Sequence, residues 1–318
     1  MGASSSRVRI PPLPLMSSRM KALIAIILAS LLWSTAGLAK IIVRELDPYI
    51  AAFLRFFVAS LVILPFFLKE KINRKHIFRD LVPLSLLSSA NILFYYIGLS
   101  TSTANAATLI YAGVPLVTAV IAHQWIGERM NVQKLIGILL GLVGILFIAL
   151  LPSVAKGESV TGTLTGNIFF VLAVLVWSLY TIGSRQAIAK KGYSPLTVSS
   201  VSIFTTTLFF LCISLSTFKP GYVPILTHPS TILIVLQLGI FATVATYLLF
   251  QYAVKHSSAS TAVLGNYIGP VFAILVNVAL LGETITPAFL VGTILVLAGV
   301  VIASGSGLWQ EAKDWITR

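Results

Sequence analysis

The sequence consists mainly of long apolar runs, and each run is close to the roughly 20 residues that a helix needs to cross the hydrocarbon core of a membrane. Only 10% of the 318 residues are charged, whereas a soluble domain has about 25%. This composition excludes a cytosolic enzyme and a nucleic-acid-binding domain. The runs predict ten transmembrane helices at residues 20–43, 50–68, 81–99, 105–126, 133–151, 164–187, 197–217, 231–252, 261–281 and 287–304. We therefore predict an all-α integral membrane protein surrounded by a lipid bilayer.

Basic residues outnumber acidic residues by 22 to 9, which gives a net charge of +13. Their positions explain this excess without a nucleic-acid partner. If the N-terminus is cytoplasmic, 17 of the 22 Lys and Arg residues lie on the cytoplasmic side, four lie on the other side, and Arg55 lies within the second span. Cytoplasmic loops of membrane proteins are enriched in Lys and Arg. We therefore predict cytoplasmic termini and a location in the plasma (inner) membrane.

The two halves of the sequence resemble each other at a shift of 155 residues, which aligns Pro115 with Pro270 and Gly127-Glu128 with Gly282-Glu283. Each half contains five predicted spans. Because five is odd, the second half must cross the membrane in the opposite direction to the first. Inverted repeats of this kind are typical of secondary transporters. The predicted divisions are a disordered N-terminal extension (1–19), a first repeat (20–151), a linker (152–163), a second repeat (164–304) and a cytoplasmic interfacial tail (305–318).

Short motifs recur in order along both halves. They are Trp33-Ser34 with Lys40, Leu54-Arg55-Phe56, 102–107 and Gly127-Glu128 in the first half, and Trp177-Ser178, Pro195, 257–262 and Gly282-Glu283 in the second. With these motifs the chain resembles a ten-helix, EamA-type member of the drug/metabolite transporter superfamily over nearly all of residues 20–304. The resemblance implies a substrate site between helices one to four and six to nine. The second half departs from the pattern, because residues 199–207 offer hydroxyls where the first half has Arg55.

Arg55 is the one formal charge deep inside a predicted span. An arginine at the bilayer centre costs about 2.5–3.5 kcal/mol on insertion scales, so it should face the bundle interior or a wet cavity. Arg55 then contacts a substrate carboxylate or stabilises a gate. In the alternative, it holds helix-end carbonyls or reaches the surface. Lys40 is either an interfacial anchor or part of a polar stripe with Ser30, Trp33 and Gly37 that faces a cavity.

Polar and aromatic side chains at helical spacing predict a pathway through the bundle. The predicted pathway residues are Trp33, Lys40, Arg55, Asn91, Tyr95, Tyr111, Trp177, Tyr180, Tyr247 and Asn266. Amide, hydroxyl and aromatic groups suit small zwitterions and moderately polar metabolites, although each residue taken singly is also explained by packing. Pro115 and Pro270 predict helix breaks at matching points of the two repeats, which indicate either a transport site or static kinks.

Two further features leave alternatives open. Glu128 and Glu283 lie at span ends, where we expect each to cap the helix that follows it, with a gating role as the alternative. Gly137 and Gly141 favour close helix contact, either within the chain or in a homodimer.

The predicted spans contain no Asp or Glu, so an intramembrane carboxylate proton relay is not expected. The sequence has no P-loop and no hydrolase or metalloprotease motif, and its single cysteine is Cys212. We therefore expect no cofactor, no metal site and no enzymatic activity. The predicted function is secondary transport of small metabolites, amino acids first, as an exporter or exchanger by alternating access. The alternatives are transport of drugs, nucleosides or sugars, a channel, or a membrane sensor that does not transport.

Overall fold

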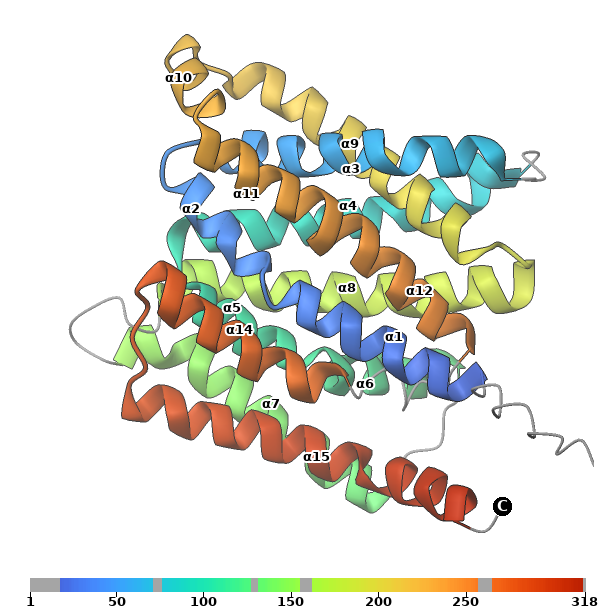
Figure 1. The fold of residues 1–318 in the computed structure, drawn as a ribbon. Coiled ribbons are helices and arrows are strands. Elements are labelled where there is room, and N and C mark those ends of the chain that lie inside the picture. The colour runs from blue at the N-terminus through green and yellow to red at the C-terminus, as the bar shows by residue number, and fades with distance from the viewer. Residues whose placement is uncertain (1–17, 71–75, 127–130, 155–161, 257–264, 317–318) are drawn as a thin grey trace, which may run out of the picture.

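The computed structural model describes residues 18–70, 76–126, 131–154, 162–256 and 265–316, and within these ranges the chain forms helices and no strands. The helices lie side by side in one bundle, in which α1 begins at the end where α15 finishes (Figure 1). In the first half the helices are α1 (Ser18–Trp33), α2 (Ala39–Val43), α3 (Pro48–Lys69), α4 (Ile77–Thr101), α5 (Ala104–Ala112), α6 (Val114–Ile126) and α7 (Val132–Val154). In the second half they are α8 (Leu164–Lys191), α9 (Pro195–Thr217), α10 (Val223–Leu226), α11 (Pro229–Gly239), α12 (Thr246–His256), α14 (Gly265–Leu281) and α15 (Pro287–Ile316).

Seven segments are long and apolar enough to cross a membrane. They are Ile24–Val43, Pro48–Lys69, Ile77–Thr101, Ala104–Trp125, Leu164–Lys191, Pro195–Thr217 and Pro229–His256. The other three predicted spans coincide with shorter apolar helices at Leu135–Ile148, Gly269–Leu281 and Phe289–Ile302. Large apolar side chains such as Leu61 and Leu208 lie exposed on the outside of the bundle, where a soluble protein would expose polar groups. The prediction of an all-helical, multi-pass membrane protein is confirmed.

Polar residues next to the apolar runs determine where several helices begin. Asp47 accepts a hydrogen bond from the Tyr49 N–H at 2.9 Å, and Pro48 occupies the first position of α3. The Ser194 hydroxyl caps α9 in the same way by accepting from the Thr197 N–H at 3.0 Å. Such caps satisfy N–H groups that have no partner inside the helix.

Three helices differ from the continuous spans that the sequence predicts. Two of them change helix type within the span, and one extends beyond the predicted end. The first span changes to a 3₁₀ turn, η1 (Ala36–Leu38), between α1 and α2. The eighth contains a π-helical turn, η4 (Ile240–Ala245), between α11 and α12. The helix at the tenth predicted span, α15, extends to Ile316 and so includes residues 305–316 of the predicted tail.

The two predicted proline breaks differ in the structure. The fourth span is divided at Gly113, so that α5 ends at Ala112 and α6 begins one residue before Pro115. By contrast, α14 runs from Gly265 to Leu281 with Pro270 inside it, and the chain stays helical through this proline.

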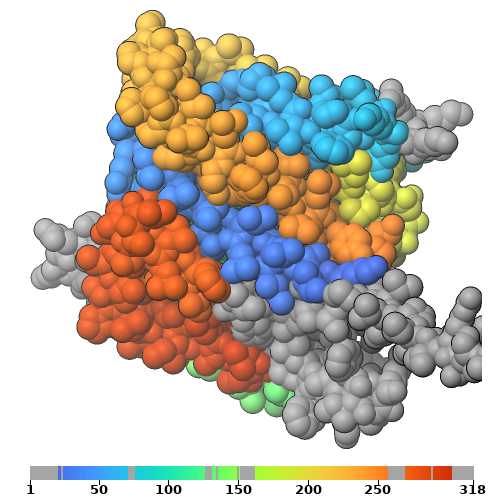
Figure 2. Space-filling model, viewed as in Figure 1, coloured from blue at the N-terminus to red at the C-terminus, as the bar shows by residue number. Residues whose placement is uncertain are grey.

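The first and second halves meet along several long interfaces. Helix α4 packs on α8 and α9, α3 packs on α9, and α1 packs on α12 and α14. Figure 2 shows α1 on one face between the segments of α11–α12 and α14. At the edge of the bundle α7 packs on α15, where a Cβ on Gly299 would lie 2.3 Å from the Gly141 nitrogen and 2.6 Å from the Gly137 carbonyl oxygen. The two predicted contact glycines therefore serve packing within the chain.

Candidate functional site

Five aromatic side chains from α1, α8 and α12 form the aromatic cluster, which consists of Trp33, Trp177, Tyr180, Tyr247 and Phe250. The ring of Trp177 lies at the centre of this cluster. Its centroid is 5.8 Å from that of Trp33, 5.0 Å from Tyr180, 5.9 Å from Tyr247 and 5.6 Å from Phe250. These separations are within the range of favourable aromatic pairs. Both halves of the chain contribute, so the cluster lies at the interface between them.

The hydroxyl groups of the cluster are held by polar side chains on neighbouring helices. The Tyr247 hydroxyl shares a hydrogen bond of 2.9 Å with Ser88 of α4, and the Tyr180 hydroxyl shares one of 2.9 Å with Ser202 of α9. The Gln251 amide donates to the Tyr180 hydroxyl at 3.1 Å. Because the two tyrosine rings are fixed both by ring contacts and by their hydroxyls, they present defined faces to the cluster.

A second group of predicted residues lies on α4 and α5. The Asn91 amide donates to the Tyr111 hydroxyl at 2.7 Å and to the Ala173 carbonyl oxygen of α8 at 2.9 Å. The Tyr95 ring lies 5.6 Å from that of Tyr111 at an angle of 87°. Tyr95 and Tyr111 remain partly exposed although they lie within the helix bundle. The structure therefore brings these three residues together.

Arg55 of α3 is 3% exposed, and its partners in the described chain are neutral. Its Nε donates to the Thr243 hydroxyl at 2.7 Å, and one terminal nitrogen donates to the Ala242 carbonyl oxygen at 2.8 Å. Both partners belong to the π-helical turn η4. A buried guanidinium without a carboxylate partner is expensive to place. These partners lie within the eighth span and not at a helix end, and the predicted contact of Arg55 with a substrate carboxylate or a gate stays a prediction.

Lys40 of α2 lies away from the aromatic cluster, at the end of the bundle where α2 and α10 lie (Figure 1). Its ammonium donates to the carbonyl oxygens of Leu99 at 2.6 Å and Ser102 at 2.7 Å, at the C-terminus of α4. A cation at a helix C-terminus complements the helix dipole. Lys40 therefore joins the first span to the third and does not reach the aromatic rings.

Glu283 lies at the same end and binds a helix other than the one that we predicted. Its two carboxylate oxygens accept from the N–H groups of Ala104 at 2.6 Å and Asn105 at 2.7 Å. These N–H groups begin α5, so Glu283 caps a helix of the other half instead of the following helix α15. Burial raises the pKa of the Glu283 carboxyl, although the two N–H donors and the charges of Lys40 and Arg44 oppose this shift. We call Lys40, Glu283 and their four main-chain partners the Glu283 clamp.

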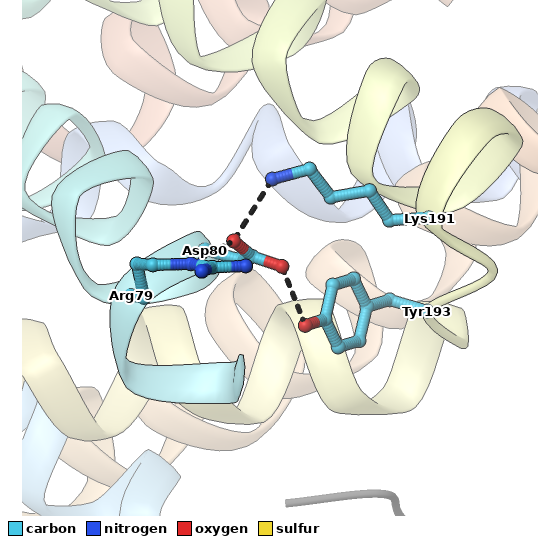
Figure 3. Close-up of polar contacts among 4 residues, drawn as sticks. All are labelled: Arg79, Asp80, Lys191 and Tyr193. Carbon is cyan, nitrogen blue, oxygen red and sulfur yellow. Dashed lines mark hydrogen bonds and ion pairs between the residues drawn. The ribbon is translucent and has the colours of Figure 1, made fainter. Parts of the chain in front are cut away.

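At the opposite end of the bundle Asp80 links α4 to the C-terminus of α8. Its carboxylate pairs with the Lys191 ammonium at 3.0 Å and accepts from the Tyr193 hydroxyl at 3.0 Å, while Arg79 lies beside it at 3.4 Å (Figure 3). We call these four residues the Asp80 cluster. The Arg79 and Lys191 side chains are 74% and 51% exposed, so water reaches the ion pairs.

These contacts also involve residues that are not among the predicted pathway residues, namely Ser88, Ser202, Thr243, Phe250, Glu70 and Asp80. Glu70 accepts from the Thr197 hydroxyl at 3.0 Å and from the Ser194 hydroxyl, at the start of α9. The serines and Phe250 are of types that usually pack in membrane helices, and Asp80 lies just outside the predicted span 81–99. Polar residues at helical spacing, Ser88 with Asn91 and Thr243 with Tyr247 and Gln251, are the signals in the sequence for this region.

Some predictions lie outside the part of the chain that the structure describes. These are the extension before residue 18, residues 127–130 with Glu128, the linker residues 155–161, the repeated motif 257–262 and the tail residues 317–318. Asn266 belongs to α14, but its side chain is also outside this part. Among the described residues, no group of three His, Cys, Asp or Glu side chains is close enough to hold a metal ion.

Comparison with known proteins gives a consistent result over most of the chain. The model of the EamA-like transporter family matches twice, at residues 20–150 and 164–305. An uncharacterized transporter of Clostridium kluyveri is 25% identical over 303 residues, covering 92% of this chain and 96% of its own length. One of Archaeoglobus fulgidus is 29% identical over 291 residues (90% and 96%), and the uncharacterized transporter YyaM of Bacillus subtilis is 27% identical over 283 residues (86% and 89%).

A solved crystal structure shares the fold with a TM-score of 0.63 at 22% sequence identity, covering 89% of this chain and 96% of that one. The two family matches divide the chain between α7 and α8, and the aromatic cluster lies where helices of the two matched segments meet. The three relatives, which the chain matches over most of their length, are named as uncharacterized transporters. Because the two matched segments together span most of the chain, the chain belongs to the EamA-like transporter family.

Proposed function

We propose that this protein is a secondary transporter of small metabolites that carry a carboxylate, amino acids first, and that the solute binds at the aromatic cluster. The observation that supports this most is the composition of the site. Trp33 and Trp177 supply aromatic faces, and Tyr180 and Tyr247 supply hydroxyls. Arg55 supplies a buried positive charge that has no acidic partner among the residues that the structure describes. A solute carboxylate would provide the missing negative charge, because charges interact strongly at low dielectric.

The arrangement of the halves supports alternating access. We propose ten transmembrane helices in two inverted repeats, 20–151 and 164–304, so that the three shorter apolar helices complete the spans of each repeat. In this arrangement the solute site lies at the repeat interface near the middle of the membrane, as in other inverted-repeat transporters. Rocking of one half against the other would then expose the site to each side in turn.

The proposed orientation places both termini in the cytoplasm of a cell whose plasma membrane holds the protein. The loops at the α1 N-terminal end carry most of the Lys and Arg residues, in agreement with the positive-inside rule. The Glu283 clamp then lies at the outer face and the Asp80 cluster at the cytoplasmic face.

The test is counterflow in proteoliposomes. Vesicles are preloaded with unlabelled amino acids and presented with labelled ones, and we expect labelled solute to accumulate above the level of empty vesicles. Trp177→Leu should abolish accumulation, because it removes the ring at the centre of the cluster. Phe94→Leu is the matched control, because the Phe94 ring does not belong to the cluster. Its centroid lies 6.0 Å from that of Phe169.

Three results would overturn the proposal. If no amino acid accumulates, this substrate class is refuted, and nucleosides, sugars and lipophilic drugs become the solutes to test. If amino-acid amides compete as well as the amino acids themselves, the site does not select a carboxylate. Single-channel conductance without saturable exchange would instead identify a channel.

A further inference from the structure

The π-helical turn η4 is the feature of the bundle that neither the repeat nor the proposed transport explains. It occupies residues Ile240–Ala245 of the eighth span, between α11 and α12. The residues 155 positions earlier, 85–90, belong to the uninterrupted helix α4. The turn is therefore present in one repeat and not in the other. π-Helical turns are rare and frequently occur at functional sites.

A π turn affects everything that follows it in the helix. It contains one residue more than an α turn, and each residue of an α-helix rotates the chain by about 100°. If η4 became α-helical, α12 would turn by about that angle relative to α11. Tyr247 is the second residue of α12, and Phe250 and Gln251 follow one turn later. The π turn therefore determines whether these three side chains face Trp177 and Tyr180.

Arg55 is the side chain that holds this turn from outside. Its Nε donates to the Thr243 hydroxyl at 2.7 Å, and a terminal nitrogen donates to the Ala242 carbonyl oxygen at 2.8 Å. The Thr243 hydroxyl in turn donates to the Leu238 carbonyl oxygen at 2.8 Å, five residues back. One guanidinium thus binds two adjacent residues of the turn, and through Thr243 it is linked to the last turn of α11.

The backbones of α3 and α11 also approach closely at this point. A Cβ on Gly239 would lie 2.9 Å from the Arg55 carbonyl oxygen and 2.7 Å from Cγ1 of Val58. Gly239 directly precedes the π turn. Its lack of a side chain lets α3 lie near enough for the short Arg55 contacts to form.

We infer that Arg55 is a positioning residue, whose guanidinium fixes the π-helical turn η4 and thereby aims Tyr247, Phe250 and Gln251 at the solute site. Its charge acts on the solute from this fixed place, while at least two of its nitrogens are used by Thr243 and Ala242. The expected effect of Arg55 on transport rests on the proposed function. The expected effect of Arg55 on the direction of the Tyr247 side chain is independent of the proposed function.

The inference is tested by removing the acceptor and keeping the arginine. Thr243→Val retains the size and burial of the side chain and removes the hydroxyl that accepts from Arg55, whereas Thr243→Ser retains the hydroxyl. Thr246→Val is the matched control, because Thr246 is equally buried and its hydroxyl bonds to the Thr243 carbonyl oxygen of the same span at 3.0 Å, without a hydrogen bond to Arg55.

The first readout is the ¹⁹F resonance of 3-fluorotyrosine placed at position 247 in the full-length protein. We expect Thr243→Val and Arg55→Lys to shift this resonance, and Thr243→Ser and Thr246→Val to leave it near the wild-type position. An unchanged resonance in Thr243→Val would overturn the inference, whatever the protein transports.

The second readout is the counterflow of amino acids. We expect Thr243→Val to lower Vmax/KM about tenfold, because Tyr247 and Phe250, whose direction it changes, belong to the proposed solute site. Restoration of Vmax/KM in Thr243→Ser would support the inference. If only Arg55 variants change transport, and do so through KM, Arg55 is a direct solute ligand and the inference fails. If the wild type transports no amino acid while the resonance shifts as expected, the proposed substrate fails and the positioning role stands.

Discussion

The two ends of the bundle are both tied by charged residues, but they use these residues differently. In the Glu283 clamp, Lys40 and Glu283 bind main-chain carbonyl and N–H groups at the ends of α4 and α5. In the Asp80 cluster, side chains pair with side chains, and the partner Lys191 is half exposed (Figure 3). The first arrangement satisfies main-chain groups that a helix leaves without partners. In the second, the Asp80 side chain is 10% exposed, but its cationic partners lie largely in water, which screens the ion pairs.

This difference indicates which end is the more firmly closed. A charged group that bonds to partly buried main-chain groups contributes more than a neutral hydrogen bond does, and loss of that group leaves the main-chain partners unsatisfied. Exposed ion pairs contribute little because water and salt screen them. We therefore expect the Glu283 clamp to contribute more to the stability of this conformation than the Asp80 cluster does. At the end with the Asp80 cluster, α4 and the C-terminus of α8 should separate at a lower cost in free energy.

The largest effect should follow from Glu283→Ala. This change removes both acceptors from the Ala104 and Asn105 N–H groups, and we expect unfolding in detergent to become easier by about 1–3 kcal/mol. Thermal unfolding followed by circular dichroism measures the change. Asp80→Ala is the comparison, and an equal fall in Tm for both variants would show that the two ends are equivalent.

Lys40→Met should have the next largest effect. It keeps the length of the side chain and removes the donor to Leu99 and Ser102, so we expect a loss of roughly 1–2 kcal/mol. Lys40 and Glu283 also interact through their charges. The double variant Lys40→Met/Glu283→Gln should therefore cost less than the sum of the single variants, and strict additivity would contradict a shared clamp.

The sequence was a good guide to the spans. Residues 197–217 were predicted and α9 is Pro195–Thr217, because an apolar run ended by Pro195 on one side and Lys219 on the other leaves little choice. Helical spacing also grouped Trp177 with Tyr180, whose rings lie 5.0 Å apart. These are local properties, and helix geometry makes them readable from the chain alone.

The features that could not be predicted depend on contacts between distant segments. Glu283 precedes α15 by a few residues, so capping of α15 was the natural expectation, yet its partners are 178 and 179 residues away. The π turn η4 depends on Arg55, which is 187 and 188 residues from its partners. Residues 240–245 are apolar or small and fit an α-helix equally well, so that tertiary contacts decide the helix type.

A change of pH should have a smaller effect on Tm. The direction of this effect shows whether burial of Glu283 or its two N–H donors dominates the pKa of the carboxyl. Because burial raises the pKa of Glu283 in the folded protein, the folded state binds a proton more readily than the unfolded chain does. The pH-dependent part of the contribution of Glu283 to stability is then full below its unfolded pKa and is lost as pH rises through its folded pKa.

We therefore expect the wild type to gain Tm relative to Glu283→Gln as pH falls from 7 towards the usual range of a carboxyl group, at about pH 4–5. The difference between the two proteins cancels the titration of all other groups. A relative loss of Tm on acidification would mean that the Ala104 and Asn105 N–H groups outweigh burial.

The smallest effect should come from Asp80→Asn, which removes the charge from the Asp80 cluster and keeps an oxygen that can accept from the Tyr193 hydroxyl. We expect no resolvable change in Tm at about 0.15 M salt, because ion pairs with exposed partners are screened at this ionic strength. At about 0.01 M salt screening is weaker, and a small fall in Tm should become measurable. Lys191→Gln should show the same dependence on salt, since it removes the other member of the 3.0 Å pair. If either variant lowers Tm as strongly as Glu283→Ala at both salt concentrations, the ion pair is effectively buried, and the two ends of the bundle are closed by contacts of similar strength.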